Sequence, residues 1–296
     1  MLKFPERSSD GGERSNRKVT APMPFRLNRR ARSDGRKPAL AIAVTAIVMF
    51  AATSAGALGI VSYEETPFTQ AEIDHNWVVD RSPPSGGYES VTFEGRTNVL
   101  EMRVDPDNRN EDSPFYYTEG LLRQTADATA LRADVYIDPA WVGQDVRAGL
   151  WGVGHDGASA RSAYPIVEYH QEDGSAGWRV WDSDGGQWLS HPATTGHGKW
   201  ATVEIVLDSE PGQFVMSVDG VSATLPVLGS ETLGEVIVNM YNFGPGTPAY
   251  AMHVSDFAIG HVLPSPVEKD DCRKGGYADF GYTNQGLCIA GIVSNS

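Results

Sequence analysis

Apolar and polar residues alternate in short runs along most of the chain, from about residue 76 to residue 259. Alternation with a period of two predicts β-strands that bury one face, and the glycine, proline, asparagine and aspartate residues between the runs predict turns. The expected strands are 76–80, 90–93, 99–104, 115–122, 131–137, 147–153, 187–190, 200–207, 214–218, 221–225, 236–243 and 250–259, with two more in a central hairpin. Only Asp138–Val142 indicates a short helical turn. The pattern predicts an all-β protein, a sandwich of two large antiparallel sheets.

The central hairpin is the best candidate for a functional surface. Within Tyr164–Asp184, two runs of β-forming residues flank a loop expected at Asp173–Ala176. With Glu172 facing Gly177 across the loop, two further pairs follow: Glu168 with Trp181, and His170 with Arg179. Because side chains alternate along a strand, these four share one face. The other face is apolar and consists of Val167, Tyr169, Trp178 and Val180. We expect the apolar face in the core and the polar face open to solvent.

Aromatic residues extend this candidate surface. The apolar face of an indole can stack on a sugar ring. Trp151 lies on a neighbouring glycine-rich strand, and the alternation that sends Val180 inward sends Trp181 outward. The expected ligand-binding residues are Glu168, His170, Arg179, Trp181, Trp151 and Tyr241, and none of them is assigned a catalytic role.

Charge divides the chain into two unlike parts. Residues 1–37 hold eleven Lys and Arg against four acids, a net charge of +7, whereas the rest of the chain has a net charge of −21. The uncharged run 39–61 contains Ala55-Gly56-Ala57. A basic start, an apolar run and an Ala-x-Ala site predict a secretory signal peptide cleaved after Ala57, with Met23 as a possible true start. An uncleaved anchor is the alternative, since residues 39–61 are long enough to span a bilayer. Both predictions place the folded part outside the cytoplasm.

The acidic balance limits the partners. Binding to nucleic acid requires clustered Lys and Arg, which a net charge of −21 disfavours. Anionic polysaccharides such as alginate are disfavoured for the same reason, although one local arginine can bind a carboxylate. The expected partner is a neutral extracellular or cell-wall polysaccharide, with membrane contact only through an uncleaved leader. Acidic charge also keeps an exported protein soluble.

A short signature links the chain to a known superfamily. Lys199-Trp200 opens an alternating strand, and Pro211-Gly212-Gln213 precedes the hairpin sequence Phe214-Val215-Met216-Ser217-Val218-Asp219-Gly220. This signature resembles laminin-G-type domains of the concanavalin A-like superfamily, over about His75 to His261. The resemblance implies a jelly roll. The superfamily includes lectins, adhesion modules, glycosidases and polysaccharide lyases, many of which bind glycans on the concave sheet.

Two enzymatic alternatives follow for the hairpin face. Laminarinase-type glycosidases carry Glu-x-Asp-x-Glu or Glu-x-Asp-x-x-Glu on a concave strand, and Glu168 and Glu172 have this spacing with His170 in place of the aspartate. A polysaccharide lyase needs an arginine, a histidine or glutamine, and a tyrosine, which Arg179, His170 and Tyr241 can supply. We expect secreted, non-catalytic carbohydrate recognition or adhesion. A glycoside hydrolase or polysaccharide lyase is the alternative, and a structural surface protein is a third.

The C-terminal tail contains Cys272 and Cys288, the only two cysteines. In an exported chain this pair predicts a disulfide, and the tail has no histidine to complete a zinc site. The pattern Cys-x-x-Gly-Gly-aromatic…Asn-Gln-Gly-x-Cys resembles a short C-terminal motif of exported bacterial proteins, usually with Trp where Tyr277 stands. The expected organisation is a leader at 1–57, a connecting segment at 58–74, the sandwich at 75–261, a linker at 262–271 and the tail at 272–296.

No cofactor or metal is expected. Two turns, Asp105–Asp112 and Asp182–Gly186, are rich in oxygen ligands. Arg109 and the missing mid-loop glycine break the EF-hand pattern in the first turn. Calcium at one of the two turns is therefore the alternative to ordinary surface turns.

Overall fold

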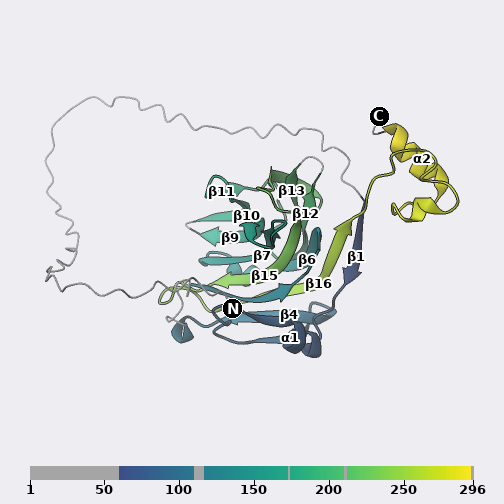
Figure 1. Cartoon of the computed structure of the whole chain (residues 1–296). Coiled ribbons are helices and arrows are strands. Elements are labelled where there is room, and N and C mark those ends of the chain that lie inside the picture. The colour runs from purple at the N-terminus through teal and green to yellow at the C-terminus, as the bar shows by residue number, and fades with distance from the viewer. Residues whose placement is uncertain (1–59, 110–116, 173, 210–211, 295–296) are drawn as a thin grey trace, which may run out of the picture. The chain divides into compact units, whose positions relative to one another are not determined.

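The computed structural model describes residues 60–109, 117–172, 174–209 and 212–294, and the expected leader lies outside them. Within these residues, sixteen strands form two eight-stranded antiparallel sheets (Figure 1). Sheet A contains β1 (Val61–Glu65), β3 (Tyr88–Phe93), β4 (Arg96–Val104), β6 (Ala130–Ile137), β12 (Lys199–Asp208), β13 (Gln213–Val218), β14 (Val221–Pro226) and β16 (Tyr250–Val262). Sheet B contains β2 (Trp77–Arg81), β5 (Thr118–Gln124), β7 (Val146–His155), β8 (Arg161–Ala163), β9 (Ile166–Glu172), β10 (Ser175–Asp182), β11 (Gln187–Ser190) and β15 (Thr232–Tyr241). The jelly-roll sandwich predicted from the sequence is confirmed.

The strand order places the predicted hairpin within sheet B. Sheet B runs β11-β10-β9-β7-β15-β5-β2, with β8 paired to β7, and sheet A runs β14-β13-β12-β6-β16-β4-β3, with β1 paired to β16. The hairpin strands β9 and β10 therefore lie beside β7, and β15 is the next strand along. Strands far apart in the sequence are thus brought to one surface.

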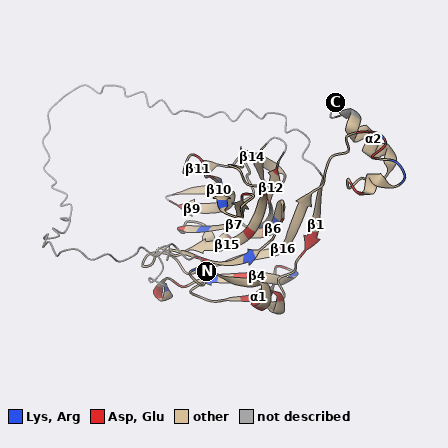
Figure 2. Ribbon diagram, viewed as in Figure 1, with Lys and Arg blue, Asp and Glu red and all other residues tan. Residues whose placement is uncertain are grey.

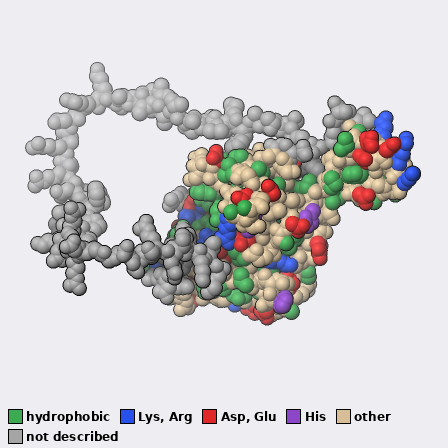
Figure 3. Space-filling view, in the orientation of Figure 1, with side chains coloured by type: hydrophobic (Ala, Val, Ile, Leu, Met, Phe, Trp, Pro, Cys, Tyr) green, Lys and Arg blue, Asp and Glu red, His purple; other side chains and the backbone are tan. Residues whose placement is uncertain are grey.

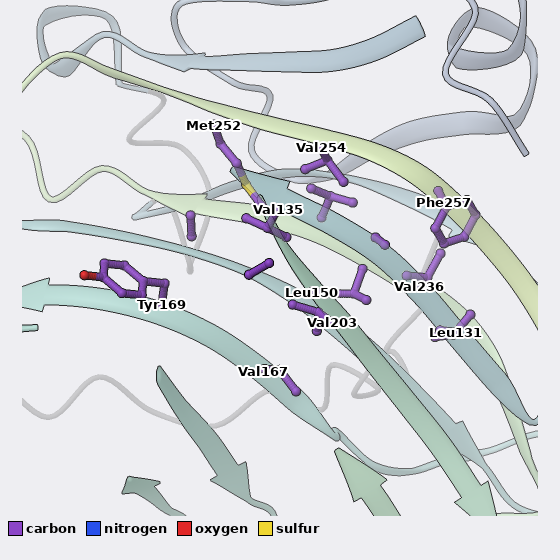
Figure 4. Packing of buried hydrophobic residues seen from close by; sticks show 14 of the residues in the cluster. Leu131, Val135, Leu150, Val167, Tyr169, Val203, Val236, Met252, Val254 and Phe257 are labelled. Atoms are coloured by element: carbon purple, nitrogen blue, oxygen red, sulfur yellow. The ribbon is translucent and has the colours of Figure 1, made fainter. Parts of the chain in front are cut away.

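The core fills the space between the two sheets. Figure 4 shows side chains of both sheets meeting there, among them Leu150 and Val167 from sheet B and Val254 from sheet A. The predicted apolar face of the hairpin is confirmed, because Val167, Tyr169, Trp178 and Val180 are all buried in this cluster. Burying the apolar face of each strand is what holds the sheets together.

The hairpin register differs from the predicted one by two residues. Glu172 pairs with Ser175, so only two residues separate β9 from β10, where a loop of four was expected. As a result Glu168 faces Arg179, and His170 faces Gly177. A shift of two leaves every side chain on its predicted face, because the side-chain period of a strand is two. The predicted pairs were wrong, but the predicted faces were right.

Helical segments are short. The expected turn is present as η2 (Pro139–Trp141), capped by the Asp138 carboxylate, which accepts a 2.8 Å hydrogen bond from the Ala140 N–H. The others are α1 (Gln70–Asn76), η1 (Pro106–Asn108), η3 (Gly276–Ala278) and α2 (Gln285–Ser294). The sequence pattern did not reveal α1 or α2. β1 and most of α1 fall within residues 58–74, where a connecting segment was expected. No helix in the described ranges is long and apolar enough to cross a membrane.

The tail contains the predicted disulfide between Cys272 and Cys288. The two cysteines are 16 residues apart, so the bond closes a short loop. By restricting the unfolded chain, a loop of this length adds about 3 kcal/mol to the free energy of unfolding of the tail. We expect replacement of both cysteines by serine to make the tail sensitive to protease while leaving the melting temperature of the sandwich unchanged. Limited proteolysis and thermal unfolding of the full chain measure the two effects. A large fall in melting temperature would contradict this prediction.

Candidate functional site

The outer face of sheet B, turned away from sheet A, carries most of the predicted binding residues. Strand alternation sends Glu168 and His170 outward from β9, and Arg179 and Trp181 outward from β10. Arg147 and Trp151 of β7, the strand beside β9, lie on the same face, as does Tyr241 of β15, the strand after β7. We call the polar set on this face the polar cluster: Arg147, Glu168, His170, Glu172, Arg179, Asn239 and Tyr241. Figure 2 shows acidic and basic segments side by side on these strands.

Two arginines hold the two glutamates of the polar cluster. Nε of Arg179 donates a 2.6 Å hydrogen bond to Oε1 of Glu168, and its Nη1 donates a 2.7 Å hydrogen bond to Oε1 of Glu172. Arg147 forms a second ion pair with Glu172. One guanidinium therefore neutralises both carboxylates.

A glycine makes room for this arrangement. Gly149 of β7 pairs with Glu168 of β9, and a Cβ on Gly149 would lie 2.5 Å from the Glu168 Cβ. The same Cβ would lie 2.7 Å from the Val167 carbonyl oxygen. The missing side chain therefore lets Glu168 lie close over β7.

Glu168 is fully buried, with 0% of its surface exposed. Burial raises the pKa of its carboxyl from 4.5 to about 7, and the neighbouring Arg179 only partly opposes that rise. The prediction that Glu168 and Arg179 are open to solvent was wrong, because Arg179 is also buried, with 8% exposed. Neighbouring strands supply the aromatic and charged side chains that surround the pair.

His170 and Tyr241 have shifted pKa values of opposite sense. Burial and the positive charges of Arg179 and Arg147 lower the pKa of His170, so its imidazole is neutral near pH 7. Burial, followed by the Glu168 charge, raises the pKa of Tyr241 well above 10, so its hydroxyl keeps its proton. A neutral base and a protonated acid thus lie on one face.

Several polar atoms of this face lack hydrogen-bond partners within the described residues. They are His170 Nδ1, Asn239 Oδ1, Arg147 Nε and Trp151 Nε1. Buried polar atoms are nearly always paired in folded proteins, and exceptions need an explanation. Such atoms on one sheet face offer donors and acceptors to a water molecule or a ligand.

Arginine guanidinium groups lie over two of the aromatic rings on this face, those of Trp151 and Trp188. The Arg81 guanidinium carbon lies 4.5 Å from the Trp151 ring centroid, and the Arg179 carbon lies 4.3 Å from that of Trp188. Trp181 is half-buried and packs edge-on against Trp188, with ring centroids 5.3 Å apart. Arginines therefore already occupy one face of two of these rings. Trp181 points outward as predicted.

Sequence reasoning missed Arg147, Glu172 and Asn239 as members of the site. The sequence did contain a signal for Arg147. It begins the predicted glycine-rich strand, and glycines within a strand indicate that a neighbouring backbone or a ligand approaches closely. Asn239 lies in a run that is otherwise apolar, where a polar residue on a strand is conspicuous. Glu172 was considered only as the partner of Glu168 in a glycosidase pair.

Clusters of metal-ligating side chains were sought among the described residues. No group of three or more His, Cys, Asp or Glu side chains within them is arranged to hold an ion. Part of the Asp105–Asp112 turn lies outside these residues.

Figure 3 shows acidic, basic and hydrophobic side chains interspersed over the visible face of the folded part.

Comparison with known proteins gives likeness of fold only. No family model matches the chain, and no curated protein matches its sequence. Among solved structures, a sialidase is 15% identical to this chain, with a TM-score of 0.44. The matched region covers 71% of this chain and 19% of the sialidase. A GlcNAcα1-4Gal-releasing endo-β-galactosidase from Clostridium perfringens is 9% identical with a TM-score of 0.46, over 70% of this chain and 64% of that one.

An alginate lyase from Chlorella virus is also similar, at 12% identity and a TM-score of 0.41, over 65% of this chain and 96% of the lyase. The chain thus spans less than two thirds of the first two of these proteins. At such low identities and TM-scores, the likeness concerns the arrangement of strands and does not bear on activity.

Proposed function

We propose that this chain is an exported polysaccharide lyase whose active site is the polar cluster on the outer face of sheet B. The observation that supports the proposal is the grouping of a neutral histidine, a protonated tyrosine and two arginines on adjacent strands. Perturbed pKa values of opposite sense on one surface are typical of acid–base chemistry. The proposal replaces non-catalytic recognition and a neutral glycan with catalysis on a uronate-containing glycan.

The reaction would be a β-elimination. Arg147, whose Nε has no hydrogen-bond partner among the described residues, binds the uronate carboxylate, which acidifies the adjacent C–H. Nδ1 of His170, which has no hydrogen-bond partner among the described residues, takes that proton. The electron pair forms a C=C bond as the glycosidic C–O bond breaks, and the Tyr241 hydroxyl gives its proton to the leaving oxygen. Glu168 positions Arg179 through their ion pair.

A glycosidase is supported less well by the same residues. A retaining glycosidase needs one free carboxylate as nucleophile and a second as acid, about 5–5.5 Å apart. Here Arg179 binds both Glu168 and Glu172, and Arg147 binds Glu172 as well. Neither carboxylate is a free nucleophile.

Substitution of His170 tests the proposal. The full chain is incubated with a panel of uronate-containing and neutral polysaccharides, and unsaturated product is followed by its ultraviolet absorbance. We expect product only from a uronate polymer, and a loss of about 10²–10⁴-fold in rate for His170→Asn, the usual contribution of a general base.

His261→Asn is the matched control, because His261 is an exposed histidine on sheet A and should leave the rate unchanged. New reducing ends without ultraviolet absorbance would indicate hydrolysis and contradict the lyase. Binding of a polymer without any cleavage would also contradict it and support non-catalytic recognition.

A further inference from the structure

We propose that Arg81 and Trp151 form a second anion-binding subsite, which recognises an acidic substituent of the polysaccharide away from the point of cleavage. This inference rests on the proposed action on a polysaccharide and extends it to the charge pattern of the substrate. Arg81 ends the edge strand β2, and Trp151 lies in β7, near the middle of sheet B.

The backbone of Arg81 adopts an unusual conformation. Its φ is +50°, in the left-handed region that residues other than glycine rarely adopt. Residues held in this region are found more often at functional sites than elsewhere. Here this conformation accompanies placement of the guanidinium over the indole of Trp151, 4.5 Å from the ring centroid.

The guanidinium of Arg81 is only partly used. Its Nε donates a 2.6 Å hydrogen bond to Oδ2 of Asp80. Among the described residues, its two terminal nitrogens have no hydrogen-bond partner, and its side chain is 24% exposed. Two free N–H groups in a planar fork match the oxygens of a carboxylate or a sulfate ester.

Trp151 supplies the other half of the subsite. It is 7% exposed, and its Nε1 has no hydrogen-bond partner within the described residues. The stacked indole fixes the plane of the Arg81 guanidinium, which lowers the entropy lost when an anion binds. The unpaired indole N–H is a further hydrogen-bond donor in this part of the face.

The position of the subsite indicates a separate substituent. Arg147 and Trp151 lie on the same strand and the same face, four residues apart, which corresponds to about 13 Å along β7. One carboxylate therefore cannot bind at Arg147 and at the Arg81–Trp151 pair together. The substrate would therefore be a polysaccharide with acidic groups on more than one sugar unit.

Binding measurements on the full chain test the subsite directly. The probes are a polyuronate, the same polymer after chemical reduction of its carboxyl groups, and a sulfated neutral glucan. Arg81→Met keeps a long unbranched apolar side chain and removes the guanidinium. We expect it to weaken binding of an acidic polymer about tenfold, the size expected for a charge-assisted hydrogen bond, and to leave binding of the reduced polymer unchanged.

Two further variants complete the design. Arg273→Gln removes an exposed arginine of the tail, which is 59% exposed, and should leave every affinity unchanged. Arg81→Lys should restore part of the affinity, because it keeps the charge without the fork. A loss confined to the polyuronate identifies a carboxylate as the ligand, and a loss confined to the sulfated glucan identifies a sulfate ester.

The outcomes separate this inference from the proposed reaction. Selective weakening by Arg81→Met in a chain that cleaves nothing would support the subsite and reject the lyase. Equal affinities of wild type and Arg81→Met for both acidic polymers would overturn the subsite even if the chain is a lyase. An equal loss for the reduced polymer would also overturn it, because Arg81 would then act by packing alone.

Discussion

Replacing Arg179 with methionine is expected to lower the free energy of unfolding by about 3–5 kcal/mol. This is the usual cost of removing one partner of a buried ion pair and leaving the other partner buried. Glu168 is 0% exposed, and Arg179 is its only ion-pair partner within the described residues. Without Arg179 the carboxyl must stay buried uncharged or draw in water. Chemical denaturation of the full chain at neutral pH measures the loss.

A double variant tests the cause of that loss. Glu168→Leu combined with Arg179→Met replaces both charges by apolar side chains, so it should be more stable than Arg179→Met alone. Arg273→Met, at an exposed tail position, is the control and should change stability by less than about 0.5 kcal/mol. If Arg179→Met were as stable as wild type, Arg179 would not stabilise the buried carboxyl of Glu168, contrary to this prediction.

The stability of the wild type should contain a component that falls as pH rises from 4.5 to about 7. The pKa of Glu168 is raised from 4.5 to about 7, so between these values the folded state holds a proton that the unfolded state has lost. Stability contributed by this proton is fully present below pH 4.5 and is lost as pH passes the folded pKa of about 7. A shift of this size corresponds to about 3 kcal/mol.

The comparison with Glu168→Gln isolates that component. His170 and His191 both have lowered pKa values, so they act in the opposite direction and must be subtracted. Because both histidines remain in Glu168→Gln, the difference in unfolding free energy between wild type and variant should move in favour of the variant across the window. A difference that stays constant with pH would show that the pKa of Glu168 is ordinary.

Strand alternation made the fold and the two faces of the hairpin predictable. Val167 and Val180 point into the core, and Glu168 and Trp181 point away from it. The direction of each side chain follows from the local pattern, because side chains alternate along a strand whichever residues pair across the hairpin. The register did not follow, since a loop of four residues and one of two are both compatible with Asp173–Ala176.

Burial of the polar face was not predictable from local pattern. Glu168 is enclosed because Gly149, Arg179 and Tyr241 come from three other strands, one of which, β15, is distant in sequence. Their pairing depends on strand order, which alternation does not encode. The short helix α1 was also missed, since its seven residues are too few to show a helical period.

The fate of the cleaved bond tests the central claim most directly. The full chain is incubated with a uronate polymer in water enriched in heavy oxygen. Early samples are reduced at once with borohydride, before the anomeric oxygen exchanges with water, and are analysed by mass spectrometry. A lyase gives oligosaccharides that contain an unsaturated sugar and no heavy oxygen at the new ends, because no water enters the broken bond. Heavy oxygen at the new ends, or a polymer of unchanged length, would contradict the assignment of the polar cluster as a lyase active site.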